Sequence, residues 1–198
     1  MISIALATYN GSKFLREQLD SILAQSMENF EVVACDDCST DETRQILEEY
    51  ASKDSRFKVF LNKNNLGFKK NFEHILSLCK GDFIAFCDQD DIWESNHLEI
   101  LYKNIGNNDC IGANSLIIDE NGIPQNKTLL EYWPIHVMPK NEKELFQHEL
   151  YSNVIQGTAS LIRASLINQA LPIPENIKYH DYWFALVAGL NEKCKYIG

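Results

Sequence analysis

The chain has 198 residues, of which 45% are hydrophobic, and it carries a formal net charge of −10. This composition excludes a disordered chain, and the acidic balance argues against general nucleic-acid binding, which needs a basic face. No apolar run reaches the 18 residues of a membrane span, and residues 1–10 lack the basic region of a signal peptide, which predicts a cytoplasmic protein.

The first half of the chain alternates strand and helix patterns. Continuous apolar runs predict buried strands at 2–7, 30–37, 57–61 and 82–87. Between them we expect a helix capped by Ser12, a helix opened by the capping box Ser39–Glu42, and a helix over 68–79. Such alternation predicts βαβ units and a mainly parallel sheet covered on both faces. The predicted fold class is therefore α/β.

The second half is less regular. We expect helices over 94–105, over 141–152 and near the end of 170–190, and strands over 110–119, 153–163 and 194–197. Residues 123–139, with three prolines and Trp133, predict a mobile or substrate-covering loop. The chain stops just after a strand-like segment without a polar tail, so we expect the native chain to continue beyond it.

Six cysteines occur in this chain, and Cys35 and Cys38 form a C-x-x-C pair. A zinc site would need a second closely spaced Cys or His pair, which the sequence lacks. A thioredoxin-like site would open a helix, whereas this pair straddles two aspartates. We therefore predict free thiols that pack as small hydrophobic side chains.

Polar residues follow three of the predicted strands, at 8–10, 36–37 and 88–91. Ligands of open α/β sheets bind beyond the carboxyl ends of the strands, so these residues outline a binding site. Asp88 and Asp90 lie two residues apart, on the same side of an extended backbone. Two carboxylates in this arrangement suit Mg²⁺ or Mn²⁺ that also binds substrate phosphates. The alternative is an acidic turn that caps the following helix.

Four ordered segments read "SIALATYNGSKFLREQLDSILAQS", "FEVVACDDCSTDET", "NLGFKKNFEHIL" and "DFIAFCDQDDIW". Together they resemble inverting glycosyltransferase family 2, and within it the bacterial rhamnosyltransferase-like branch. The resemblance is strong over 2–98, patchy over 106–150, and returns at "NVIQGTASLIRAS" and "HDYWFALVAG". It implies a GT-A (Rossmann-like) fold, with a nucleotide-sugar-binding half in 1–105 and a less regular acceptor-binding half of the same domain in 106–198.

The resemblance also assigns residues to the sugar donor. Asp37 matches the aspartate that accepts the N3–H of uracil or thymine, which implies a UDP- or dTDP-sugar. Asp90 matches the metal-binding aspartate, and Asp88 begins the D-x-D. The residues expected to bind the donor are Ala7, Tyr9, Asp37, Lys70, Asp88, Gln89 and Asp90. A helix cap is the alternative for Asp37, and a solvated helix face is the alternative for Lys70.

Asp181, in "YHDYW", matches the family's catalytic base, which deprotonates an acceptor hydroxyl as it attacks the anomeric carbon. A helix N-cap is the alternative. The residues expected on the acceptor side are Trp93, Gln156, Gly157 and His180; core packing is the alternative for Trp93 and His180. The implied acceptor is a saccharide or a lipid-linked saccharide in surface polysaccharide synthesis, reached through peripheral contact at the inner face of a bacterial membrane.

Longer family members continue with a polar or histidine residue near the metal, and this chain ends first, so we expect an incomplete ligand set. A haloacid-dehalogenase phosphatase also has a D-x-D, but Thr or Val follows it there, whereas Asp91 and Ile92 follow here. A nucleotidyltransferase would need a Gly-rich, Arg-containing first loop, and a phospho-receiver domain would need an aspartate after 57–61. A catalytically silent nucleotide-sugar-binding relative stays open as an alternative.

Overall fold

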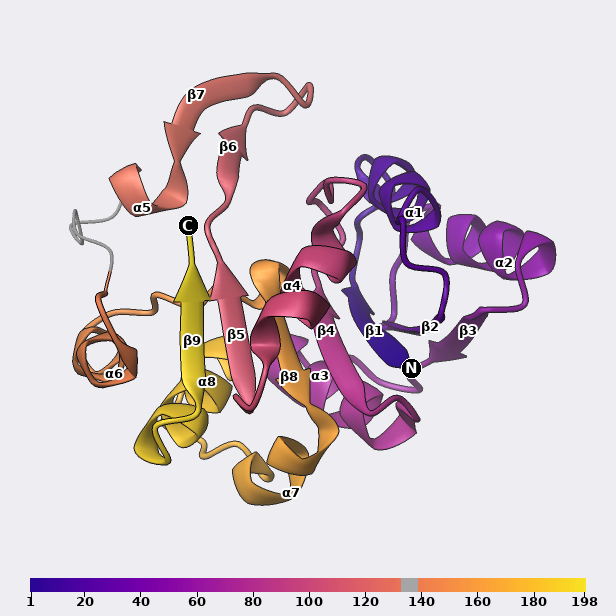
Figure 1. The fold of residues 1–198 in the computed structure, drawn as a ribbon. Coiled ribbons are helices and arrows are strands. Elements are labelled where there is room, and N and C mark those ends of the chain that lie inside the picture. Colours follow the sequence, from indigo (N-terminus) through magenta and orange to yellow (C-terminus); the bar gives the residue numbers. More distant parts are fainter. Residues whose placement is uncertain (133–138) are drawn as a thin grey trace.

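The computed structural model describes residues 1–132 and 139–198, and its centre is a mixed sheet (Figure 1). In the described part of the chain the sheet has seven strands in the order β3-β2-β1-β4-β8-β5-β9. Pairing is parallel from β3 to β4 and between β5 and β9, while β8 runs antiparallel to both of its neighbours. The strands are β1 (Ile2–Thr8), β2 (Phe30–Asp36), β3 (Phe57–Leu61), β4 (Phe83–Cys87), β5 (Cys110–Ala113), β8 (Ser160–Arg163) and β9 (Cys194–Ile197).

Helices cover both faces of the sheet. One core cluster joins the sheet to α1 (Leu15–Leu23), α2 (Thr43–Lys53) and α4 (His97–Ile105). The other cluster joins it to α3 (Phe68–Leu78), α6 (Glu142–Glu149), α7 (Ile167–Ala170) and α8 (His180–Leu190). Figure 1 shows α4 on one side of the sheet and α3 on the other. Within the described residues, every helix is too short or too polar to cross a bilayer.

β1, β2 and β4 bury side chains on both faces, which explains their continuous apolar runs, whereas Phe57 is the one buried residue of the edge strand β3. In β2, Val32 contributes to one core cluster and Val33 to the other, because successive side chains of a strand point to opposite faces. The predicted α/β class and the mainly parallel sheet flanked by helices are confirmed.

The strand expected over 110–119 is two strands. β5 ends at Ala113, and β6 (Leu116–Ile118) pairs instead with β7 (Pro124–Thr128) in a separate hairpin, which α5 (Leu129–Tyr132) follows. Asn114 separates β5 from β6, since its side-chain oxygen accepts the N–H groups of Ser115 and Leu130. The loop expected over 123–139 therefore contains β7 and α5, and its residues 133–138 lie outside the described residues.

Both predicted serine caps are wrong. The N-cap residue of α1 is Phe14, and Ser12 instead donates its backbone N–H to Asp41. The N-cap residue of α2 is Glu42, while the hydroxyl and the N–H of Ser39 both donate to Asp36. Asp41, in the loop after β2, and Asp36, the last residue of β2, are therefore the partners of these serines in place of the helix ends.

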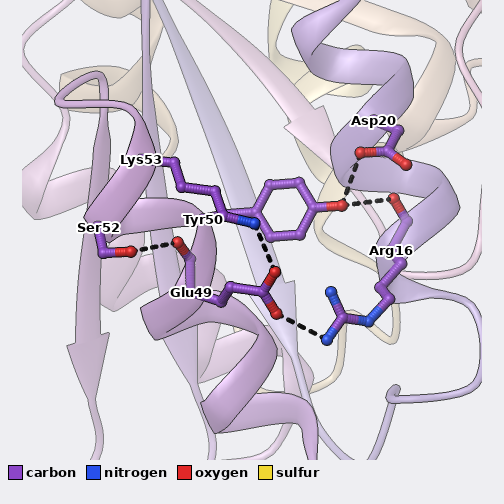
Figure 2. Close-up of polar contacts among 6 residues, drawn as sticks. All are labelled: Arg16, Asp20, Glu49, Tyr50, Ser52 and Lys53. Carbon is purple, nitrogen blue, oxygen red and sulfur yellow. Dashed lines mark hydrogen bonds and ion pairs between the residues drawn. The ribbon is translucent and has the colours of Figure 1, made fainter.

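A polar cluster joins α1 to α2 (Figure 2). The hydroxyl of Tyr50 donates to Asp20 over 2.6 Å, and Glu49 accepts from Arg16 over 2.8 Å and from Lys53 over 2.6 Å. These contacts hold together the two helices that follow the loops at the carboxyl ends of β1 and β2. They are separate from the candidate site described below.

All six cysteines are free, and four of them, Cys35 among them, are buried. Burial raises the pKa of the Cys35 thiol to about 12. The prediction of free, packed thiols is confirmed.

Candidate functional site

Two cavities open at the edge of the sheet where β1, β2 and β4 end. The first, which we call the Asp37 cavity, has a volume of about 380 Å³. The second, which we call the Asp119 cavity, has a volume of about 500 Å³ and extends toward the β6–β7 hairpin. Asp88 and Asp90 line both cavities. The two aspartates of the D-x-D therefore lie where the two cavities meet, and the remaining lining residues of each cavity are different.

The Asp37 cavity contains most of the residues predicted to bind the donor. Ala7 and Tyr9 lie at the end of β1, and the Tyr9 side chain is 50% exposed, so its ring is available for stacking. The other residues that line this cavity include Asn65, Phe68, Asn71 and Phe72.

Asp37 is buried, and its carboxylate anchors the loop before α3. Oδ1 accepts from the Asn62 side chain and from the N–H of Leu66, and Oδ2 accepts from the N–H of Gly67, each over 2.8 Å. A carboxylate offers about four lone-pair positions, so one on Oδ2 is left for a ligand in the cavity. Asp37 does not cap α2, which was the alternative reading of this residue.

Gln89 fixes the backbone of Tyr9. Its Oε1 accepts the Tyr9 N–H over 2.9 Å, and its Nε2 donates to the Tyr9 carbonyl over 3.0 Å. A Cβ at Gly11 would lie 2.1 Å from Gln89 Oε1, so glycine leaves the space in which the Gln89 amide sits. Gln89 thus connects the loop after β4 to the loop after β1.

Asp88 lies in a crowded acidic environment. Burial, together with the nearby carboxylates of Asp91, Asp181 and Asp90, raises the pKa of Asp88 to about 7. A cation at this point would offset both effects. In the described part of the chain, no group of three or more His, Cys, Asp or Glu side chains is arranged to hold a metal ion. Asp88 and Asp90 fit a Mg²⁺ or Mn²⁺ ion whose other ligands come from substrate and water.

Lys70 is exposed on α3 and is not among the residues that line the Asp37 cavity. Its neighbour Lys69 donates to the backbone carbonyls of Pro174, Glu175 and Ile177. Lys69 therefore holds the loop before α8 against α3, while a role for Lys70 at the nucleotide stays a prediction.

Asp181 lies in the first turn of α8, whose N-cap residue is Tyr179, so it is not the N-cap. Its side chain is buried, and Oδ2 accepts from the Gly157 N–H over 2.9 Å and from the Asn153 side chain over 3.1 Å. Oδ1 accepts the N–H of Tyr182. Gly157 begins a 3₁₀ helix, η1 (Gly157–Ala159), in a segment that the sequence predicted as a strand over 153–163. β8 begins only at Ser160.

His180 is packed rather than exposed. Its ring stacks on Phe72 at a centroid distance of 3.8 Å and meets Phe86 edge-on at 4.7 Å. Burial lowers the pKa of His180 to about 4, although the carboxylate of Asp181 acts in the opposite direction. Neither ring nitrogen has a hydrogen-bond partner among the described residues. This geometry makes His180 a neutral packing partner beside Asp181.

The other predicted acceptor-side residues lie around the Asp119 cavity. Gln156 lines it directly, together with Thr158. Trp93 is buried in the core and donates its ring N–H to the Thr158 hydroxyl over 3.2 Å, and it lines a smaller neighbouring cavity of about 250 Å³. Most of the Trp93 side chain is therefore packed in the core, which was the alternative for this residue.

The sequence missed two residues that hold the site together, Asn62 and Asn153. Asn62 directly follows β3 at the carboxyl end of a strand, which is the signal that identified Asp37 and Asp88. Asn153 lies in a segment predicted as a strand, and the sequence carries no signal that would have placed it against Asp181.

Three similarities to known proteins bear on this site. A model of the family described as "Glycosyl transferase family 2" matches residues 3–170. The putative glycosyltransferase EpsE of Bacillus subtilis strain 168 is 36% identical over 126 residues, which cover 62% of this chain and 45% of EpsE. The putative teichuronic acid biosynthesis glycosyltransferase TuaG of the same organism is 34% identical over 99 residues, which cover 50% of this chain and 39% of TuaG.

A solved structure covers nearly the whole chain. The crystal structure of S. aureus TarS 1-349 in complex with UDP-GlcNAc matches with a TM-score of 0.73 at 25% identity, over 99% of this chain and 55% of that one. The chain thus spans between 39% and 55% of the length of these three proteins.

Proposed function

The chain belongs to glycosyl transferase family 2 and has the GT-A fold, and from that premise we propose that it transfers a sugar from a UDP- or dTDP-sugar to a saccharide or lipid-linked acceptor. Two cavities that meet at Asp88 and Asp90 are the observation that carries this proposal. A transferase must hold a donor and an acceptor on either side of the bond that breaks, and this edge of the sheet offers two spaces with a shared wall.

In this proposal the Asp37 cavity binds the nucleotide. Tyr9 stacks on the base, and Oδ2 of Asp37 accepts the N3–H that uracil and thymine carry and neutral cytosine lacks. The complex of TarS with UDP-GlcNAc is consistent with a uridine donor. The resemblance to the rhamnosyltransferase-like branch makes dTDP-rhamnose the first dTDP-sugar to test.

Asp88 and Asp90 would hold Mg²⁺ or Mn²⁺. The bound ion would supply positive charge to the diphosphate leaving group at a point lined by carboxylates. Gln89 lies between the two aspartates in the sequence, and its two hydrogen bonds to the Tyr9 backbone hold Tyr9 next to them. Lys70→Ala tests whether the exposed lysine contributes further charge to the nucleotide.

Asp181 is the proposed base. It takes the proton from the acceptor hydroxyl as the oxygen attacks the anomeric carbon opposite the nucleoside diphosphate, so the configuration inverts in one displacement. The departing group needs no second carboxylate to protonate it, in contrast to a glycosidase. Gln156 and Gly157, next to the Asp119 cavity, would position the acceptor.

The two halves of the domain divide these tasks. Residues 1–105 carry the proposed nucleotide and metal residues, and 106–198 carry the base and, apart from Trp93, the residues proposed for the acceptor side. TuaG, a putative teichuronic acid biosynthesis glycosyltransferase, supports a role in surface polysaccharide synthesis, where a lipid-linked acceptor would bring the protein to the inner face of the membrane.

A nucleotide panel tests the proposal. UDP or dTDP should raise the melting temperature, and the rise should depend on Mn²⁺, whereas ADP and GDP should have little effect. Turnover of UDP-GlcNAc and dTDP-rhamnose, followed as nucleoside diphosphate release, then separates an active enzyme from a silent binding relative. A shift that is independent of metal, or that only purine nucleotides give, would contradict the proposal.

A further inference from the structure

The segment from Glu149 to Gly157, which we call the 149–157 loop, joins α6 to η1 and holds the side chain of Asp181. Two of its donors reach the same carboxylate oxygen, since Asn153 Nδ2 and the Gly157 N–H lie 3.1 and 2.9 Å from Asp181 Oδ2. The loop is also bonded within itself, because the Gln156 side chain donates to the Asn153 carbonyl over 3.0 Å.

Glu149 anchors this loop from inside the protein. Its side chain is 1% exposed, and Oε2 accepts the N–H of Val154 over 2.9 Å. Oε1 has no hydrogen-bond partner within the part of the chain that the structure describes. A buried carboxyl with one oxygen unpartnered is costly as an anion but tolerable as a neutral acid.

The charge state of Glu149 agrees with this geometry. Burial, with a further contribution from the carboxylate of Asp181, raises the pKa of Glu149 to about 8. At neutral pH the residue is therefore mostly protonated. It can fix the loop without placing a second negative charge behind Asp181.

Resting on the proposed function, we propose that Asn153 and Glu149 are positioning residues for Asp181: Asn153 holds its carboxylate directly, and Glu149 holds the loop that carries Asn153 and Gly157. Neither residue is expected to touch the donor. Together they leave one of the four lone-pair positions of Asp181, on Oδ1, for the acceptor hydroxyl, since the other three accept from Asn153, Gly157 and Tyr182.

The chemistry of the two side chains suits a base. An amide at Asn153 orients the carboxylate without the full positive charge of Lys or Arg, which would stabilise the anion and weaken it as a proton acceptor. A displacement of about 1 Å at a reacting group costs on the order of 100-fold in rate, so loosening this loop should reduce kcat without changing donor binding.

Four variants of the full-length protein test the inference: Asn153→Ala, Glu149→Ala, Glu149→Gln and Ser152→Ala. We expect kcat for nucleoside diphosphate release from the donor that the wild type turns over to fall 10- to 100-fold in the two positioning alanine variants, with KM for the donor within twofold of wild type. Glu149→Gln keeps a neutral side chain that can accept the Val154 N–H, so it should retain most of the activity. Ser152→Ala is the matched control, because the Ser152 hydroxyl lies in the same loop and has no partner among the described residues.

A second readout does not need turnover. Hydrogen exchange at the Gly157 amide, followed by NMR, should accelerate at least tenfold in Asn153→Ala and Glu149→Ala and stay unchanged in Glu149→Gln and Ser152→Ala. Melting temperatures and UDP affinity identify a variant that has simply unfolded.

The outcomes are distinguishable. Wild-type kcat and wild-type Gly157 protection in Asn153→Ala and Glu149→Ala would overturn the positioning role even in an active enzyme. A wild-type protein that releases no nucleoside diphosphate would instead contradict the proposed function, and the exchange data would still decide whether the loop holds Asp181. A failure of Glu149→Gln to rescue would overturn the neutral role of Glu149.

Discussion

Gly157 donates its backbone N–H to Oδ2 of Asp181 over 2.9 Å, and a Cβ at Gly157 would lie only 3.4 Å from the Cβ of Asp181. The same Cβ would lie 3.3 Å from Nε2 of His180, whose ring is held between Phe72 and Phe86. The contact with His180 is the tighter one, so an alanine in place of Gly157 would press on a ring that cannot easily move, and the first turn of α8, which carries Asp181, would shift away from Gly157.

Gly157→Ala should therefore reduce turnover more than it reduces donor binding. We expect kcat to fall at least tenfold, and the free energy of unfolding to fall by about 1–3 kcal/mol, the usual range for overpacking. Steady-state kinetics and urea unfolding measure the two effects. UDP affinity is the internal control, since the Asp37 cavity does not include Gly157, and an unchanged kcat would contradict the role of this contact.

Asp37→Asn should weaken the loop before α3 and nucleotide binding together. An amide has one acceptor oxygen, whereas the carboxylate accepts on both oxygens from Asn62, Leu66 and Gly67. At least one partly buried N–H would lose its hydrogen bond to a charged group, which is worth about 2 kcal/mol. Calorimetric UDP titration should show at least a tenfold loss of affinity. A variant that unfolds more easily but binds UDP normally would restrict Asp37 to a structural role.

Gly11→Ala and Gln89→Ala should have the same effect, because each removes the Gln89 amide from the Tyr9 backbone. A double-mutant cycle on UDP affinity is the measurement. The double variant should bind UDP no more weakly than either single variant, whereas additive losses would mean that the glycine and the glutamine act separately.

Asp88→Asn should raise the melting temperature of the metal-free protein and remove most of the additional rise caused by UDP with Mn²⁺. The first effect follows because the amide removes a half-buried carboxyl that neighbouring carboxylates destabilise. Thermal-shift assays with and without Mn²⁺ measure both effects. Glu94→Gln, at an exposed acid after the cluster, is the matched control and should leave both values unchanged.

Glu149→Gln should change how stability depends on pH. The pKa of Glu149 is about 8 in the folded protein against an ordinary value of 4.5, so between these values the folded state holds a proton that the unfolded state has released. The stability that Glu149 contributes is therefore complete below pH 4.5 and is lost as the pH rises through 8, by about 1 kcal/mol per pH unit. The free energy of unfolding of Glu149→Gln, relative to that of the wild type, should therefore rise between pH 4.5 and 8.

Urea unfolding of both proteins at several values between pH 5 and 8.5 tests this. Glu142→Gln, at an exposed acid in the first turn of the same helix, should differ from the wild type by a constant amount. A constant difference for Glu149→Gln as well would mean that Glu149 is ionised in the folded protein.

The sequence predicted the first half of the fold well because strands buried on both faces leave continuous apolar runs. It also predicted that Asp37, Asp88 and Asp90 meet, because parallel strands bring their carboxyl ends to one edge. The cap at Ser12 was wrong because Asp41, brought close by the fold, binds this serine instead, and the cap at Ser39 was wrong because the side chain of Asp36, three residues earlier, binds it.

The surroundings of Asp181 could not be predicted in the same way. Residues 153–163 have a strand-like composition, and nothing local indicates that η1 precedes β8 or that β8 runs against β4. Glu149 is an acidic residue at the end of a helix, which suggests solvent exposure, but it is buried in the fold, where α6 packs against α8 and β9.

Because β8 runs antiparallel to β4, the two sides of this edge of the sheet come from different stretches of the chain. At the edge where the parallel strands β1, β2 and β4 end, the residues that line the site follow each strand. The antiparallel strand β8 begins at this edge, so the residues that precede it, η1 and the 149–157 loop, lie there from a different stretch of chain. In the proposed transferase, a change in length or sequence between α6 and Ser160 would therefore remodel the side proposed for the acceptor and leave the loops after β1, β2 and β4 as they are.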